Sequence, residues 1–346
     1  MFTLPPTMRA SVLQSKGVVT LTDVPTPDVG PNQVLVEVAS VGVCGSDVHY
    51  YHDGRIGDFI VAQPMILGHE ASGVIVATGR DVDGGRVGQR VSIEPQHVCR
   101  VCPQCKAGRY NLCEHIEFYA TPPIDGAFSQ YAVIDTDFAH AVPDCLSFDA
   151  AALCEPLSVG IWSNMKAGTT ANSRVLIAGA GPIGLILAQT AKAFGAGEVI
   201  VSEPQAARRE QATSLGADVA LDPAQTDFSS PDLRVDSFID ATGVEQAISQ
   251  GISAVRGNGR VVLVGMSPNP DQTLPTATIA ARELSVTGIF RYANTWPAAI
   301  KLASSKRVDL DRLVTGHYSL AQVEQALLST HDPATLKSMV VPGQAC

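Results

Sequence analysis

The feature that most constrains the fold is a set of spaced glycines between two apolar segments. Residues 174–178 have the composition of a buried strand, and residues 185–195 have the spacing of an amphipathic helix. Gly179, Gly181 and Gly184 lie between them. Glycines in this Gly-x-Gly-x-x-Gly pattern permit a tight turn, a close approach of backbone to a pyrophosphate, and close helix–strand packing, while the helix N-terminus faces the phosphates. The context predicts a dinucleotide-binding Rossmann unit, and a purely structural turn is the alternative.

The next expected strand, residues 198–202, is followed by Glu203. An acid at about this distance from the glycines accepts hydrogen bonds from the adenosine ribose hydroxyls of NAD and repels the extra phosphate of NADP. The sequence therefore predicts NAD as the cofactor. The alternative is that Arg208 or Arg209 meets a phosphate instead.

The domain organisation follows from length and pattern. At 346 residues the chain is longer than one hydrophobic core usually serves, so two domains are expected. Short alternating or β-branched runs, broken by proline and glycine, predict an irregular, mostly β, barrel-like first domain. Strand-like and helical runs then alternate as βα units require. We predict an α/β protein with a mostly β domain at 1–156, a doubly wound parallel sheet at 157–289, and a return to the first domain at 290–346. The expected strands are 8–21, 33–43, 73–79, 88–93 and 128–134 in the first domain, and 174–178, 198–202, 235–240, 259–265 and 284–290 in the second.

Four cysteines, Cys99, Cys102, Cys105 and Cys113, lie within fifteen residues. Two successive Cys-x-x-Cys steps let short turns direct thiolates at one point, and the longer third interval lets the chain return with the fourth ligand. A closed Cys₄ site binds Zn²⁺ structurally, because no position is left for water. A redox Cys-x-x-Cys pair is the alternative, but it requires only two cysteines and a βαβ context. We predict a structural zinc lobe at 97–115.

A second candidate metal site lies at Cys44, His69 and Glu70, among several glycines. A thiolate, an imidazole and a carboxylate are ligands that Zn²⁺ accepts at an open catalytic site. From these residues alone, the alternative is a buried thiol and a histidine at the end of a strand. Glu155 lies in a mostly apolar segment with helical spacing, where it either needs a partner or faces water at the helix end.

Charge and apolar patterning exclude several classes of partner. The formal net charge is −10 without any block of lysines or arginines, so we expect no nucleic-acid or anionic-lipid partner and a small uncharged substrate instead. No apolar run reaches membrane-spanning length, and residues 1–10 lack the pattern of a signal peptide. We expect a cytoplasmic protein whose cysteines are metal ligands or buried thiols rather than disulfides.

Several motifs together resemble one family over essentially the whole chain: the zinc-dependent medium-chain dehydrogenase/reductase superfamily, and within it the polyol (sorbitol/xylitol) dehydrogenases. The resemblance implies a GroES-like catalytic domain interrupted by a Rossmann domain, one catalytic and one structural zinc per chain, and a homotetramer. Several animal members lack the structural-zinc cysteines, whereas all four are present here. The similar motifs are 44–50, 54–57, 67–72, 179–184 and 290–297.

The resemblance also implies a reaction and roles for particular residues. Zn²⁺ acts as a Lewis acid on a polyol hydroxyl, and the carbinol carbon gives its hydride to NAD as the ketose forms. Cys44 and His69 are expected ligands, Glu70 is the expected third ligand, and Glu155 handles water, substrate and protons or, alternatively, ligates the metal. Ser46 and His49 are expected to carry the alcohol proton outward; outside this motif His49 would be an ordinary loop histidine. The implied substrate contacts are Tyr50, Glu155, Arg291 and Tyr292, with Ile56, Phe59 and Phe118 as an apolar wall. The implied cofactor contacts are Gly179, Gly181, Pro182, Ile183, Gly184, Glu203, Arg208, Val264, Gly265, Met266, Ile289, Phe290 and Arg291.

Two alternatives to a polyol dehydrogenase stay open at this point. One is an NAD-dependent secondary-alcohol, butanediol or threonine dehydrogenase of the same superfamily. The other is a zinc-free binding protein that has kept the fold, against which the intact set of Cys44, His69 and Glu70 argues. For Arg291, the alternative role is a cofactor-phosphate contact.

Overall fold

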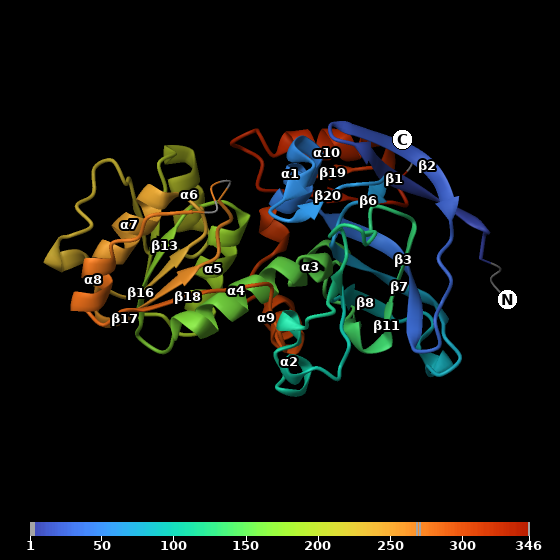
Figure 1. Ribbon diagram of the computed structural model, residues 1–346, viewed down its shortest axis with the longest axis horizontal. Coiled ribbons are helices and arrows are strands. Elements are labelled where there is room, and N and C mark those ends of the chain that lie inside the picture. Colours follow the sequence, from blue (N-terminus) through green and yellow to red (C-terminus); the bar gives the residue numbers. More distant parts are fainter. Residues whose placement is uncertain (1–3, 268, 270, 345–346) are drawn as a thin grey trace. The chain divides into compact units, whose positions relative to one another are not determined.

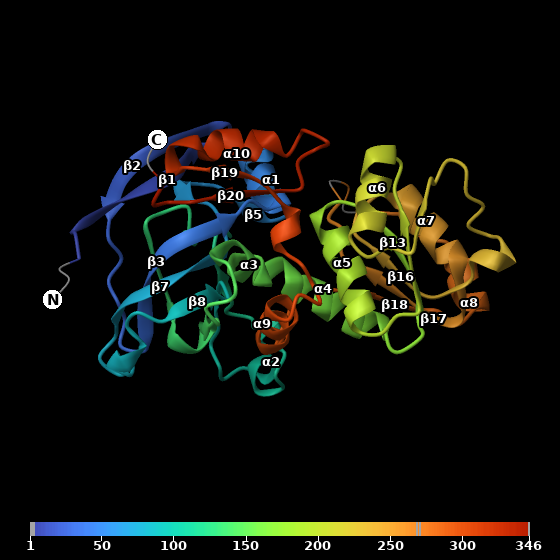
Figure 2. The same ribbon diagram turned by 180° about the vertical axis from the view of Figure 1, so that it is seen from behind.

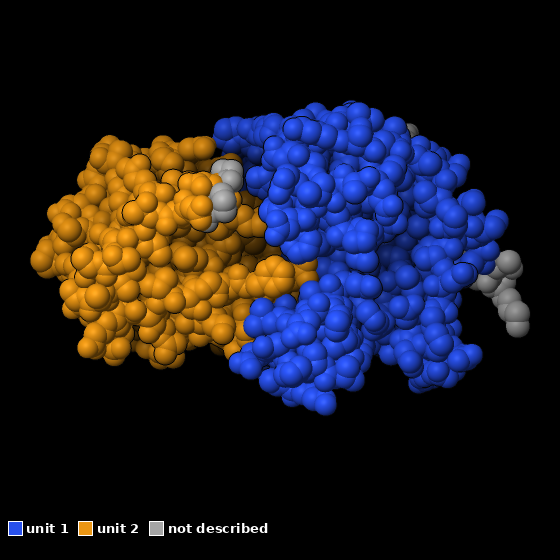
Figure 3. All heavy atoms as spheres, in the orientation of Figure 1, with its two compact units in different colours: residues 1–155, 296–304, 309–346 blue, residues 156–295, 305–308 orange. Residues whose placement is uncertain are grey.

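The computed structural model describes residues 4–267, 269 and 271–344. The chain divides into two compact units, coloured separately in Figure 3. Unit 1 comprises residues 1–155, 296–304 and 309–346, and unit 2 comprises residues 156–295 and 305–308. Among the described residues, no helix has both the length and the apolar character needed to cross a membrane.

Unit 1 is built around a mixed sheet in which β12, β8, β7, β3, β20 and β19 lie side by side, with β11 also paired to β3. Neighbouring strands in this sheet are antiparallel, except that β19 and β20 are parallel to each other. The strands are β3 (Gln33–Gly42), β7 (Glu70–Thr78), β8 (Arg90–Ile93), β11 (Tyr131–Asp135), β12 (Ala139–Ala141), β19 (Val314–Tyr318) and β20 (Lys337–Val340). Shorter sheets join β1 (Thr7–Ser15), β2 (Val18–Pro25) and β6 (Met65–Ile66), β4 (Arg55–Ile56) and β5 (Phe59–Ile60), and β9 (Gln96–His97) and β10 (Glu117–Phe118).

The run expected as strand at 8–21 is a hairpin in the structure. Gly17 has a φ of +73°, which β-branched neighbours such as Val18 and Val19 do not readily adopt, and it turns β1 back onto β2.

The helices of unit 1 are short: α1 (Gly45–Asp53), α2 (Pro103–Lys106), α3 (Phe148–Ala152), α9 (Trp296–Ser304) and α10 (Val323–Ser329).

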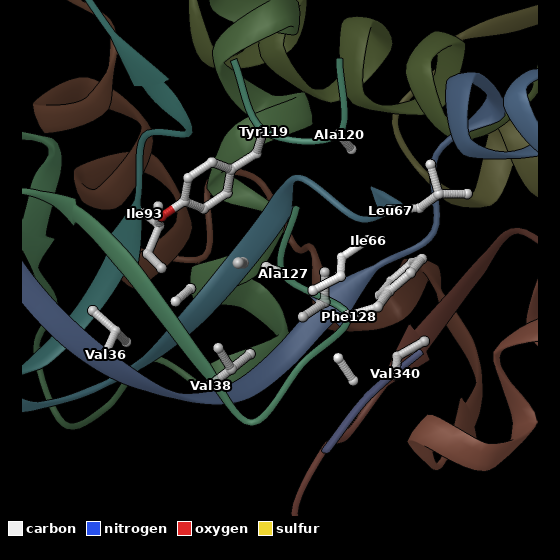
Figure 4. Packing of buried hydrophobic residues seen from close by; sticks show 14 of the residues in the cluster. Val36, Val38, Ile66, Leu67, Ile93, Tyr119, Ala120, Ala127, Phe128 and Val340 are labelled. Atoms are coloured by element: carbon white, nitrogen blue, oxygen red, sulfur yellow. The ribbon is translucent and has the colours of Figure 1, made fainter. Parts of the chain in front are cut away.

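The core of unit 1 is formed by alternate residues of the sheet strands and by the loop that follows β10. Figure 4 shows Val36 and Val38 of β3, Ile93 of β8 and Phe128 around this core. Phe128 and Ile93 are fully buried. Because one face of β3 and β7 is fixed by this packing, the ends of these strands hold their register.

Unit 2 is a parallel sheet with the order β15-β14-β13-β16-β17-β18, which is the strand order of a Rossmann fold. Figures 1 and 2 show α5 and α7 on opposite faces of this sheet, as a doubly wound fold requires. The strands are β13 (Arg174–Ala178), β14 (Glu198–Ser202), β15 (Val219–Leu221), β16 (Val235–Asp240), β17 (Val255–Leu263) and β18 (Ser285–Gly288). The helices are α4 (Cys154–Ala167), which begins in unit 1, α5 (Pro182–Ala193), α6 (Ala206–Ser214), α7 (Glu245–Ala254) and α8 (Thr276–Ala281).

Candidate metal centres and cofactor site

Cys44, His69 and Glu70 come together in unit 1 because two antiparallel strands meet there. Gly42 at the end of β3 pairs with Glu70 at the start of β7, and Cys44 follows two residues later as the N-cap of α1. One ligand atom from each of the three side chains lies within 4.8 Å of the others. His69 and Glu70 are buried, and Cys44 is half-buried.

The donor set and its surroundings fit a divalent cation. Among the described residues, the Oε2 atom of Glu70 is buried and has no hydrogen-bond partner, which leaves an oxygen available for a metal. Burial by itself lowers the pKa of His69, but Cys44 and Asp47 outweigh it and raise that pKa well above its usual value. The site therefore favours positive charge. A thiolate, an imidazole and a carboxylate so close together could hold zinc with a fourth position left open.

Asp47 supports this cluster, although the sequence interpretation did not single it out. Its side chain is fully buried on the first turn of α1. Oδ2 accepts a hydrogen bond from the Cys44 N–H at 2.9 Å, Oδ1 accepts one from the Gly68 N–H at 3.0 Å, and Oδ1 lies 3.8 Å from Nδ1 of His69. A carboxylate beside a ligating histidine fixes the orientation of the ring. The sequence feature that could have revealed Asp47 is its position three residues after a helix N-cap.

Lys337 is a second supporting residue that local sequence does not reveal. It lies on β20, and its Nζ donates hydrogen bonds to Glu70 Oε1 at 2.7 Å and to the Val43 carbonyl at 2.8 Å. Its side chain is only 4% exposed. Burial alone lowers the pKa of Lys337, but Glu70 and then Cys44 raise it above its usual value, so the ammonium stays charged.

The other residues with predicted roles in unit 1 differ in burial. Ser46 and His49 are half-buried on α1, and His49 Nδ1 lies 3.2 Å from Asp53 Oδ2. Glu155 is 5% exposed at the start of α4 and is not part of the ligand cluster found among the described residues. Tyr50 and Phe118 are buried, Ile56 is half-buried and Phe59 is exposed; the Phe118 ring centroid lies 5.7 Å from that of His69.

The four cysteines of the lobe converge as the spacing predicts. One sulfur from each of Cys99, Cys102, Cys105 and Cys113 lies within 4.8 Å of the others. Backbone N–H groups point at the sulfurs: Cys102 N lies 3.3 Å from Cys99 Sγ, and Cys99 N lies 3.4 Å from Cys113 Sγ. The N–H of Cys105 is the main cause that lowers the pKa of Cys102 to about 6. Such N–H groups stabilise thiolates, which are the form that binds zinc.

We expect Cys102→Ser to destabilise the fold while sparing the active site. Loss of a structural metal is among the largest effects of single substitutions and should lower the free energy of unfolding by about 4 kcal/mol. At about 2–4 °C per kcal/mol, the Tm should fall by roughly 10 °C. Zinc content should fall from two to one per chain. The measurements are calorimetry and metal analysis, with Cys145→Ser, an exposed free thiol, as the control. An unchanged Tm with two zinc ions per chain would contradict the prediction.

The candidate cofactor site of unit 2 is a cavity of about 400 Å³ at the carboxyl ends of β13, β14 and β16, which is where open parallel sheets bind ligands. Gly179 has a φ of +96°, and a Cβ on Gly184 would lie 1.9 Å from the Gly179 carbonyl oxygen. These glycines are therefore required by the turn and by close packing. Glu203 lines the cavity, and its oxygens accept hydrogen bonds from the N–H groups of Ala180 and Gln205, each at 2.9 Å.

The arginines beside Glu203 differ in their contacts. The Nη1 of Arg209 donates to the carbonyl oxygens of Glu203 and Pro204 at 2.8 and 2.7 Å, and its Nη2 lies 3.5 Å from Asp222 Oδ2. The Arg209 guanidinium thus has three partners of its own, and Arg209 is not among the described residues that line the cavity. Arg208 is half-buried on α6.

The remaining predicted cofactor residues follow β17 and β18. The loops after β16 and β17 are held by a buried acid that sequence interpretation missed. Asp240 is fully buried; its carboxylate accepts from the N–H groups of Thr242 and Gly243, each at 3.0 Å, and its carbonyl accepts from the N–H groups of Val264 and Gly265. The sequence feature that could have revealed Asp240 is an aspartate at the end of an expected buried strand. Met266 and Phe290 are exposed, and Ile289, Arg291 and Tyr292 also belong to unit 2.

Comparison with known proteins agrees with this geometry. Residues 30–144 match the family model of the alcohol dehydrogenase GroES-like domain, and residues 182–305 match that of zinc-binding dehydrogenases. The chain is 41% identical over 331 residues to sorbitol dehydrogenase of Bacillus subtilis (strain 168), covering 94% of each protein. It is 42% identical over 339 residues to sorbitol dehydrogenase of Gallus gallus, covering 96% of this chain and 95% of that one.

Solved structures give the same class. L-Idonate 5-dehydrogenase from Escherichia coli has a TM-score of 0.91 at 28% identity, covering 97% of this chain and 98% of that one. A protein from Sinorhizobium meliloti 1021 bound to NADP has a TM-score of 0.90 at 32% identity, covering 97% and 99%. The chain therefore belongs to the zinc-dependent medium-chain dehydrogenase/reductase superfamily. Within it, the chain is a member of the polyol dehydrogenase subfamily, and the predicted family and fold class are confirmed.

Proposed function

We propose that this protein is an NAD-dependent zinc dehydrogenase that oxidises a polyol, such as sorbitol or xylitol, to the ketose. The observation that carries the proposal is the convergence of Cys44, His69 and Glu70 within 4.8 Å in unit 1. The likeness to sorbitol dehydrogenases over most of the chain supports the substrate class. Zn²⁺ held by these residues would supply Lewis acidity that makes the substrate hydroxyl more acidic.

The residues of the chain supply the remaining steps. Ser46 and His49, on the first turns of α1, carry the hydroxyl proton outward to solvent, because His49 is exposed enough to exchange it. Glu155, buried at the start of α4, binds water or a substrate hydroxyl and accepts a proton. Glu203 orients the adenosine ribose of NAD, while the N-terminus of α5 faces the pyrophosphate.

The test is a substrate panel with NAD and NADP, read by the absorbance of reduced nicotinamide. Sorbitol, xylitol and related alditols are compared with linear secondary alcohols, 2,3-butanediol and threonine. Higher kcat/KM on alditols with NAD supports the proposal. Preference for 2,3-butanediol would favour the second candidate, because 2R,3R-butanediol dehydrogenase from Bacillus subtilis matches this chain with a TM-score of 0.89 at 28% identity, covering 97% of this chain and 100% of that one.

Removal of the Arg291 side chain should impair the oxidation of polyols in particular. A site that binds a row of hydroxyls needs fixed polar groups, and removing one leaves a buried partner unmet at a cost of about 1–3 kcal/mol. Arg291→Ala should therefore lower kcat/KM on xylitol or sorbitol by roughly 5- to 150-fold. A simple secondary alcohol, measured with the same variant, should lose much less. Equal losses on both substrates would instead assign Arg291 to the cofactor or the fold.

Compartment and assembly belong to the same proposal. None of the described cysteines forms a disulfide, and one cluster of four free thiols at metal-binding distance suits a reducing cytoplasm. A homotetramer is the expectation that the family resemblance gives. Gel filtration with light scattering measures it, and a monomer would contradict it.

A further inference from the structure

We propose that Lys337 is a built-in counter-cation of the catalytic metal site, which neutralises Glu70 and holds its carboxylate in place when no metal is bound. The inference rests on the proposed zinc site and concerns its empty state. Lys337 Nζ lies 2.7 Å from Glu70 Oε1. The side chains are 4% and 1% exposed, respectively.

The charge at this point requires compensation. A buried carboxylate without a cationic partner costs several kcal/mol, and removing one member of a buried ion pair leaves that cost exposed. Glu70, Cys44 and Glu155 all act on the Lys337 ammonium electrostatically. In the metal-free protein, Lys337 is the cation in direct hydrogen-bond contact with the Glu70 carboxylate.

The backbone fixes both partners of the pair. Lys337 begins β20, which pairs with β3 through Met339 and Gly42, and its ammonium is anchored a second time on the Val43 carbonyl at 2.8 Å. Glu70 lies across from Gly42, where an added Cβ would be 2.0 Å from Oε2. A side chain at residue 42 would therefore displace the carboxylate from its present position, and Lys337 holds its other oxygen.

A counter-cation and a metal that share the same anions must oppose each other thermodynamically. Loss of Lys337 therefore destabilises the empty site more than the filled one, because Zn²⁺ neutralises Glu70 in the filled site. By linkage, the same coupling strengthens zinc binding in the variant. A lysine that merely fills space would affect both states equally.

The test compares Lys337→Met with wild type by Tm, with zinc and after chelation, at matched metal content. Zinc removal should lower the Tm of Lys337→Met by more than that of wild type, and chelator competition should show zinc binding about tenfold tighter. Lys337→Arg, which keeps the charge, and Lys16→Met, which removes an exposed lysine of the same unit, should behave as wild type. Equal Tm losses, or weaker zinc binding in Lys337→Met, would overturn the proposal.

A double-variant cycle in the metal-free protein gives an independent readout. Adding Glu70→Gln to Lys337→Met removes the uncompensated charge and should raise the Tm relative to Lys337→Met alone. A further fall in Tm would assign Lys337 a packing role and refute the counter-cation. If Lys337→Met does not fold without zinc, Lys337→Gln with the same Glu70→Gln partner replaces it. The zinc content of the wild-type protein is measured separately. One zinc per chain at saturation would refute the proposed catalytic zinc site, whereas the double-variant cycle in the metal-free protein tests the counter-cation by itself.

Discussion

We expect Cys44→Ala to lower kcat/KM for sorbitol oxidation by roughly 10³-fold or more. The Lewis acidity of a metal ion is worth several kcal/mol to the transition state, and each 1.36 kcal/mol corresponds to about a factor of ten in rate. Cys44 is the only sulfur in the cluster with His69 and Glu70. Without its thiolate, the imidazole and the carboxylate of that cluster are a weak ligand pair for zinc.

The measurements for Cys44→Ala are metal analysis and NADH production. Zinc should fall from two to one per chain, while the Tm changes less than in Cys102→Ser, because the remaining zinc lies in the cysteine lobe. Cys145→Ser again serves as the matched thiol control. A variant that keeps two zinc ions and most of its activity would exclude Cys44 as a ligand.

We expect NAD to be preferred over NADP by about 10²-fold or more in kcat/KM. Glu203 lines the nucleotide cavity and is held there by two N–H groups, so its charge meets any phosphate on the ribose. Placing like charges together costs several kcal/mol. Arg209 does not offset this cost, because two carbonyl oxygens and Asp222 already engage it.

Glu203→Ala separates the two contributions to this preference. It should remove most of the discrimination, because it weakens the binding of NAD and relieves the repulsion of the NADP phosphate. While Asp222 holds Arg209, kcat/KM with NADP should nevertheless stay low. Adding Asp222→Asn releases Arg209 and should improve kcat/KM with NADP further. Wild-type preference for NADP would show that an arginine already reaches the phosphate, and would refute the role of Glu203.

Local spacing explains what the sequence predicted well. The glycine turn and the Cys₄ lobe are each defined by neighbours in the chain, so their chemistry can be recognised without a fold. Glu203 is similar, because one βα step separates it from the glycines. The hairpin at Gly17 was missed because apolar alternation continues through it, and only the left-handed backbone of one glycine marks the turn.

Long-range pairing explains what the sequence did not predict. Lys337 reaches Glu70 across 267 positions, through a strand whose own residues indicate nothing about a metal. Asp47 and Asp240 act through backbone N–H groups, and their roles emerge only when the loops that they hold are known. The roles of Arg291 and Tyr292 stay predictions, because they lie in a different unit from the metal cluster.

The place of β20 in the sheet also orders events on the ribosome. Val43, beside the first zinc ligand, donates its N–H to Ser338 and accepts from Lys337, which is 294 residues further along the chain. The nucleotide-binding unit is nearly continuous in sequence and can fold as it is made, since domains fold as units during synthesis. The metal pocket, in contrast, is complete only when β20, which follows the last residues of unit 2 in the chain, has also left the exit tunnel.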